Sequence, residues 1–115
     1  MSRGSAHGAP LERRTVSRKT PGDGKLEITK VAAAKLESLG ASFPVTVDGL
    51  AGDATLETMP CTCRGADRPH VHYFVESTLF RALEPGGEVD LSVDARATRL
   101  IVRRVPLDAQ PEARP

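Results

Sequence analysis

The sequence predicts an α+β fold that is mostly β: a small barrel-like domain of about six strands, with one helix after the first strand. Short runs of alternating apolar and polar residues recur along the chain, separated by turns rich in Gly, Pro and Asp. One segment has helical periodicity. The chain has 115 residues, 39% hydrophobic and only 3% aromatic, so it fits one domain with a small aliphatic core.

The first half of the predicted domain contains a strand, a helix and two further strands. Thr29 suits the N-cap position of the helix, and Gly40 suits its end. The expected segments are a strand at residues 26–29, a helix at 30–39, a strand at 43–47, a turn at 48–53 and a strand at 54–63.

The second half repeats this order. It contains a strand at 70–76, one helical turn capped by Ser77 or Thr78, a turn at 85–87, and strands at 89–93 and from residue 100. Residues 45–48 align with residues 91–94, which suggests an internal duplication. A duplicated strand–helix–strand–strand unit would close a small pseudo-twofold barrel, and an unduplicated α+β sandwich is the alternative.

Both cysteines of the chain and two of its three histidines lie within residues 61–72. Cys61 and Cys63 are two residues apart, as are His70 and His72, so in strands each pair shares a face. A hairpin that places Cys61 opposite His72, and Cys63 opposite His70, brings the four side chains together. That register also opposes Glu57 to Glu76, which is unfavourable, so we expect the pairing to slip or bulge near Pro60.

Two thiolates and two imidazoles form the ligand set of a closed tetrahedral zinc site, so we predict Zn²⁺ at Cys61, Cys63, His70 and His72. A small aliphatic core would gain from such a staple on its hairpin. Two alternatives stay open: the four are ordinary strand residues, or the site takes copper(I) with Met59 on the same face. A catalytic zinc site keeps an open position, so the closed ligand set predicts a protein that is not an enzyme.

Charge divides the chain into three parts. Residues 1–24 carry five basic side chains against two acidic ones and few apolar residues, which predicts a disordered basic arm. Residues 25–106 form the predicted zinc-binding domain, and residues 107–115 a flexible tail. The arm is expected to contact nucleic acid or an acidic protein surface, or else to be a solvated linker. The expected contact residues are Arg13, Arg14, Arg18 and Lys19 of the arm, and Arg64 and Arg68 of the hairpin tip.

The segment from Phe74 to Leu91 resembles the swapped-hairpin unit of AbrB-type transcription factors, and an extension of this resemblance to residue 105 stays open. It has the strand, short helix, Pro85-Gly86 turn and Val89-Asp90-Leu91 strand of that unit. The resemblance implies a barrel of two such units, often with a basic face on DNA, and a role in transcription regulation. Gly87 stands where the family usually has an acidic residue, and histidines replace its basic run. No DNA-contact residue is carried over.

These observations predict a small zinc-stabilised binding module that docks through its basic arm on nucleic acid or on a nucleic-acid-associated complex. The alternatives are an accessory interaction subunit of a larger assembly, or a metal-handling or redox-sensing protein that uses Cys61 and Cys63. No small-molecule substrate and no membrane partner are expected, since no apolar run reaches about 18 residues. The N-terminus lacks the apolar stretch of a secretory signal, and reduced thiols suit the cytoplasm.

Overall fold

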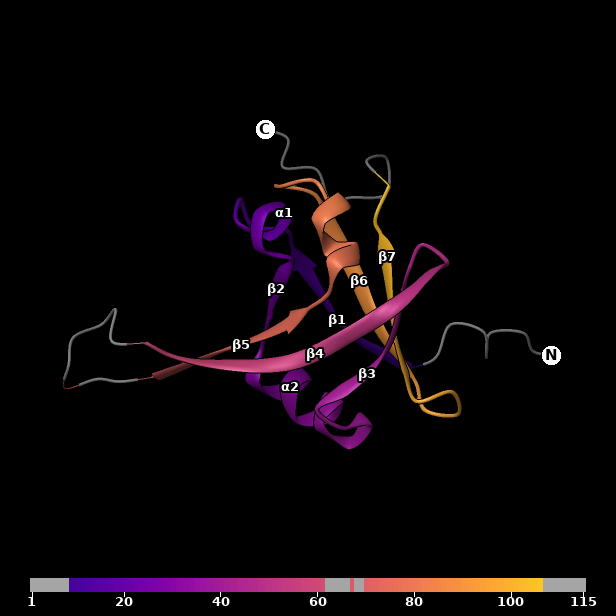
Figure 1. Cartoon of the computed structure of the whole chain (residues 1–115), viewed down its shortest axis with the longest axis horizontal. Helices are drawn as coiled ribbons and strands as arrows, with labels where there is room; N and C mark the ends of the chain where they lie inside the picture. The colour runs from indigo at the N-terminus through magenta and orange to yellow at the C-terminus, as the bar shows by residue number, and fades with distance from the viewer. Residues whose placement is uncertain (1–8, 62–66, 68–69, 107–115) are drawn as a thin grey trace.

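The computed structural model describes residues 9–61, 67 and 70–106, which form one mixed sheet with short helices (Figure 1). The mostly β, α+β class is confirmed, with seven strands where six were predicted. The strands are β1 (Ala9–Thr15), β2 (Lys25–Ile28), β3 (Ser42–Val47), β4 (Leu50–Cys61), β5 (His70–Glu76), β6 (Glu88–Asp94) and β7 (Arg99–Arg104). The helices are α1 (Thr20–Asp23), α2 (Lys30–Leu36) and the 3-10 helices η2 (Glu37–Leu39) and η3 (Thr78–Ala82).

The predicted helix over residues 30–39 is present as α2 followed by η2. It begins where the sequence indicates: the Thr29 hydroxyl accepts a hydrogen bond from the Ala32 N–H at 3.2 Å. It ends at Gly40, whose φ of 104° disfavours other residues. Ser77 caps η3 in the same way, by accepting from the Leu79 N–H. None of the helices in the described residues is long and apolar enough to cross a membrane.

The prediction of a disordered arm over residues 1–24 is wrong for residues 9–24; residues 1–8 lie outside the described part. β1 pairs antiparallel with β6, and Val16 is only 2% exposed. The backbone of Val16 also exchanges hydrogen bonds with Gly86 and Gly87, each 2.8 Å long. Composition indicated disorder because this segment has few apolar residues of its own. A long-range strand partner satisfies its backbone, and Val16 joins a core formed by other segments.

The strand order is β1-β6-β7-β3-β4-β5-β2, with β3 and β7 as the parallel pair. Side chains join the two edge strands, β1 and β2. The Arg14 Nε–H donates to the Glu27 carbonyl oxygen at 3.0 Å, and the Glu12 carboxylate accepts from the Thr29 N–H at 3.1 Å. Side-chain hydrogen bonds therefore link the two edges of the sheet, but β1 and β2 do not pair as strands in the described residues, and the predicted barrel stays a prediction.

The turn between β3 and β4 is shorter than predicted. Asp48 and Gly49 have φ values of 50° and 87°, the positive pair typical of a two-residue hairpin turn of type I′. β4 therefore starts at Leu50 instead of residue 54, and Gly52 and Asp53 pair within the sheet.

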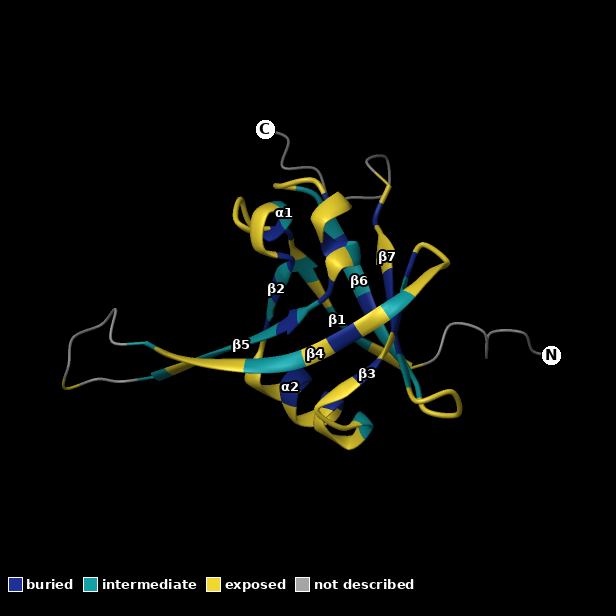
Figure 2. Cartoon of the chain, in the orientation of Figure 1, coloured by how far each residue is buried: buried dark blue, intermediate teal, exposed yellow. Residues whose placement is uncertain are grey.

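The core is aliphatic with two phenylalanines, as composition suggests, and it lies inside the curled sheet (Figure 2). Phe80 of η3 is fully buried, and α2 contributes Leu36 to the same cluster. This core is contiguous and contains neither Cys61 nor the two histidines that the structure describes. The body of the domain is thus held together by apolar packing.

The predicted duplication stays a prediction. The order β2-α2-β3-β4 is repeated by β5-η3-β6-β7, and β2 pairs with β5. In a symmetric repeat, β3 corresponds to β6 and β7 to β4, so the pairing of β3 with β7 should be matched by a pairing of β6 with β4. However, β6 and β4 are not neighbours in the sheet. The resemblance of residues 74–91 to the AbrB-type unit likewise stays a prediction.

β4 and β5 extend past the rest of the sheet as a two-stranded ribbon (Figure 1). β3 pairs with β4 only as far as Thr55, and β2 pairs with β5 only from Tyr73 onward. Beyond these points the two strands pair only with each other in the described sheet, as far as Cys61 and His70. We call this part, Leu56–Cys61 with His70–His72, the ribbon.

Candidate metal centre

Cys61, His70 and His72 converge near the end of the ribbon. One ligand atom from each lies within 4.8 Å of the other two, so the group can hold a metal ion. Cys61 ends β4, and the two histidines share a face of β5 because they are two residues apart. Cys63, the fourth predicted ligand, lies outside the described residues, as do Arg64 and Arg68.

The hairpin register differs from the predicted one by two residues. Cys61 lies opposite His70, not His72, and His72 lies opposite Met59. A shift of two keeps every side chain on its predicted face, so the ligands still gather. It also moves Glu57 opposite Phe74 instead of Glu76, but the two carboxyl groups still share a side-chain hydrogen bond, which raises the pKa of Glu76. The described pairing is continuous from Thr55 to Cys61 and has no bulge at Pro60.

The two imidazoles face each other through the nitrogens that a metal would use. His70 Nε2 and His72 Nε2 are 3.2 Å apart, with ring centroids 4.8 Å apart and an interplanar angle of 68°. Two nitrogens bound to one tetrahedral zinc at about 2.0–2.1 Å would lie about 3.3–3.4 Å apart. The spacing of the histidines thus fits a shared ion without rearrangement of β5.

Glu27 of β2 orients one of these ligands. Its carboxylate accepts from His72 Nδ1 at 2.8 Å, which leaves the Nε2 lone pair of His72 to face the cluster. A carboxylate behind a histidine fixes the tautomer and raises the basicity of the ligating nitrogen. The hydrogen bond to Glu27, followed by that to Cys61, raises the pKa of His72 above its ordinary value.

Sequence reasoning missed Glu27. It lies 45 positions before His72 in the chain, and only the pairing of β2 with β5 brings the two together. A signal exists in the alternation of β2: Leu26 and Ile28 are buried, so Glu27 points to the opposite face. Assigning it to the site would have required the strand pairing.

A cavity of about 580 Å³ adjoins the cluster on the side of β2 and α1. Its lining includes two residues of the cluster, Cys61 and His72, beside the apolar side chains of Met59 and Phe74. The remaining lining residues are Ser17, Arg18, Lys19, Asp23, Lys25 and Glu27.

The predicted partner-contact residues have different environments. Arg13 donates to both carboxylate oxygens of Asp90, at 2.6 and 3.0 Å, and this bond raises its pKa. Arg14 is held by the Glu27 carbonyl and lies 3.8 Å from the Glu12 carboxylate. Arg18 and Lys19 line the cavity beside the cluster. Arg13 and Arg14 are thus held by hydrogen bonds to other residues of the domain.

No protein-family model matches this chain, and no curated protein sequence matches it either.

Proposed function

We propose that this chain is a zinc-binding module in which Cys61, His70 and His72 hold one Zn²⁺ ion at the end of the ribbon. The observation that carries the proposal is the convergence of three ligand atoms within 4.8 Å of one another. The Glu27 carboxylate behind His72 supports it, because such a partner is common behind metal-ligating histidines. Cys63 is the proposed fourth ligand, from its spacing in the sequence.

The proposed role of the ion is to fix the ribbon. The ribbon contributes no residue to the hydrophobic core other than the partly buried Leu56 packed against it, so apolar burial holds it weakly. An ion bound to both strands would cross-link them where sheet neighbours no longer support them. We therefore expect removal of zinc to loosen the ribbon while the core stays folded, in contrast to zinc fingers that unfold without metal.

The direct test is native mass spectrometry of the protein purified without a histidine tag, before and after chelation. We expect one zinc ion per chain, lost from Cys61→Ser and His72→Gln. Met59→Leu is the matched control, since Met59 lies opposite His72 but is not a proposed zinc ligand. Wild-type protein that takes up no zinc when supplied with it, or Cys61→Ser that keeps it fully, would contradict the proposal.

A second candidate function is the handling of a soft metal such as copper(I). It is favoured by Met59, which is 45% exposed and lies beside Cys61 and His72 in the wall of one cavity. Thioether and thiolate ligands select copper(I). This function predicts that Met59→Leu weakens copper(I) binding in a competition titration and leaves zinc binding unchanged. Equal copper(I) affinity in both proteins would rule it out.

Docking on nucleic acid, or on an acidic face of a larger assembly, is our proposal for the partner. Arg13 and Arg14 are bound within the domain, so Arg18 and Lys19 are the remaining described residues of the predicted contact set. We expect a double variant, Arg18→Gln with Lys19→Gln, to weaken nucleic-acid binding and its salt dependence. Binding that is equal in wild type and variant would exclude these two residues as contacts.

A further inference from the structure

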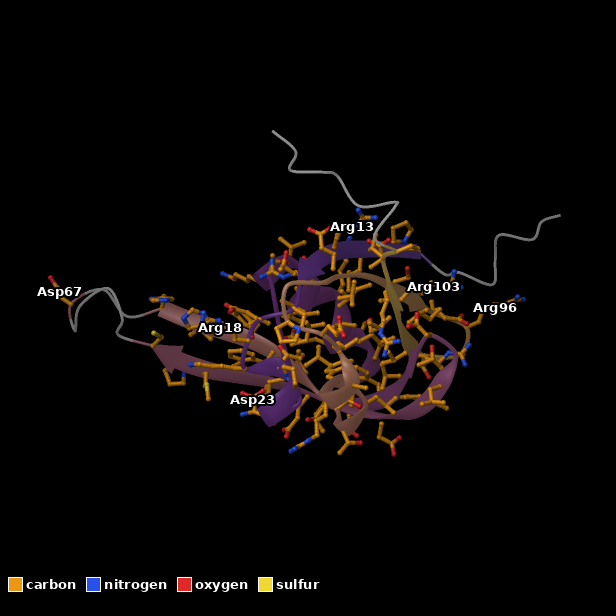
Figure 3. All side chains as sticks on the ribbon, turned by 90° about the horizontal axis from the view of Figure 1, so that it is seen from above. Arg13, Arg18, Asp23, Asp67, Arg96 and Arg103 are labelled. Atoms are coloured by element: carbon orange, nitrogen blue, oxygen red, sulfur yellow. The ribbon has the colours of Figure 1, made fainter. Side chains whose placement is uncertain are left out.

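We propose that the cavity beside the cluster binds a small organic anion, with Arg18 and Lys19 holding its carboxylate or phosphate group and Met59 and Phe74 contacting its apolar part. The site goes beyond the proposed metal centre, because neither cation belongs to the ligand set. Figure 3 shows Arg18 alongside the ribbon and Arg96 at the opposite end of the molecule.

The charged side chains that line the cavity differ in whether they have a hydrogen-bond or ion-pair partner. Glu27 accepts from His72 at 2.8 Å, and Asp23 accepts from the Lys25 backbone N–H at 2.9 Å. The Lys25 ammonium group lies 3.2 Å from the Glu57 carboxylate, and this bond raises the Lys25 pKa. Three of the five charged lining residues thus have partners, two of them within the lining and one, Lys25, at Glu57 beyond it.

The other two, Arg18 and Lys19, are both cations. Within residues 9–61, 67 and 70–106, no carboxylate lies within ion-pair distance of either side chain. They are neighbours in the chain and line the same cavity. The described structure therefore leaves a pair of adjacent positive charges in the lining of the cavity. A guanidinium is well suited to bind carboxylate or phosphate through two hydrogen bonds.

Two of the lining residues are apolar. Met59 is 45% exposed, and the half-buried Phe74 ring lies in the same lining. A cavity of about 580 Å³ is in the size range of sites that hold whole small molecules, not bare ions. The combination indicates a ligand with an anionic end and an apolar body.

The probes that test this are phenyl phosphate, phenylacetate and inorganic phosphate, each titrated into the full chain and followed by amide chemical shifts. We expect saturable shifts around Arg18, Phe74 and Met59 with at least one aromatic probe, and weaker binding of inorganic phosphate. Comparing the two aromatic probes shows which acid group is preferred. Absence of saturable binding for all three at millimolar concentration would overturn the proposal.

The matched variants separate this site from general charge effects and from the metal. Arg18→Gln with Lys19→Gln should weaken binding of the aromatic probe at least tenfold, and Phe74→Leu should weaken it with the cations intact. Arg96→Gln, a cation remote from the cavity, should not change it. Equal zinc content and melting temperature in these proteins would show that a lost anion site is not a lost metal site. Unchanged binding in the double variant, or an equal loss in Arg96→Gln, would refute the assignment.

Discussion

Neutralising Glu27 tests the arrangement of the metal centre without touching a ligand. Glu27→Gln keeps the size of the side chain and an oxygen that can accept from His72 Nδ1–H, but it removes the negative charge. The backbone carbonyl of Glu27, which accepts from Arg14, is unaffected by the change. The variant therefore isolates the electrostatic support that the carboxylate gives to one ligating imidazole.

The expected loss follows from the geometry of this contact. Removing a carboxylate behind a metal-bound histidine typically weakens metal binding by about 10- to 100-fold. Here the His72 and Glu27 side chains are 33% and 44% exposed, so water screens the interaction. We therefore expect zinc affinity to decrease by about tenfold, the lower end of that range.

The assay is competition for zinc against a chromogenic chelator, with Glu57→Gln as the control. Glu57 is a carboxylate of the ribbon that pairs with Lys25 and not with a proposed ligand. Its loss should leave zinc affinity within about twofold of wild type. If Glu27→Gln binds zinc as tightly as wild type, or if both variants lose affinity equally, the assignment of Glu27 is wrong.

Three further predictions concern the body of the domain. Phe80→Ala should lower the free energy of unfolding by about 3–5 kcal/mol in urea titration and leave zinc stoichiometry unchanged, because Phe80 is fully buried away from the ribbon; a loss below about 1 kcal/mol would contradict the described core. Thr29→Ala should lower the free energy of unfolding by about 1 kcal/mol, because it removes the N-cap of α2. Thr46→Ala, in the middle of β3, is the control for the loss of a threonine that caps no helix, and an equal loss in both variants would contradict the capping role. Asp94 has a pKa lowered by the backbone N–H of Ala97 and then by Arg99, so its contribution to stability is present above its ordinary pKa and is lost as pH falls through the lowered value. Asp94→Asn should therefore reduce the melting temperature at neutral pH and converge with wild type in acid, and a constant difference at all pH values would exclude this role.

Local signals in the sequence located most of the elements. Thr29 and Gly40 mark the two ends of the α2–η2 helix, and Asp48-Gly49 marks the hairpin turn between β3 and β4, because each residue satisfies a short-range backbone requirement. Alternation also placed Cys61 and the two histidines on one face, which is why the candidate site was predictable in outline.

Long-range pairing was not available from these signals. Periodicity fixes a face but cannot distinguish registers that differ by two residues, so the partner of Cys61 was predicted wrongly. Composition counts apolar residues within a segment, so it missed that β1 gains its backbone partners from β6. The position of Glu27 behind His72 and the cavity lined by Arg18 and Lys19 both depend on contacts between distant segments, so no short sequence motif predicts them.

The most direct measurement of the central claim is X-ray absorption at the zinc edge of the zinc-loaded full chain. We predict about two nitrogen neighbours at about 2.0–2.1 Å with the scattering pattern of imidazole, and sulfur at about 2.3 Å. Two sulfur neighbours would mean that Cys63 is also a ligand, and one sulfur neighbour would leave a coordination position for another ligand. Either result agrees with an ion bound between the strands of the ribbon. A shell of oxygens alone, with neither sulfur nor imidazole, would contradict the account.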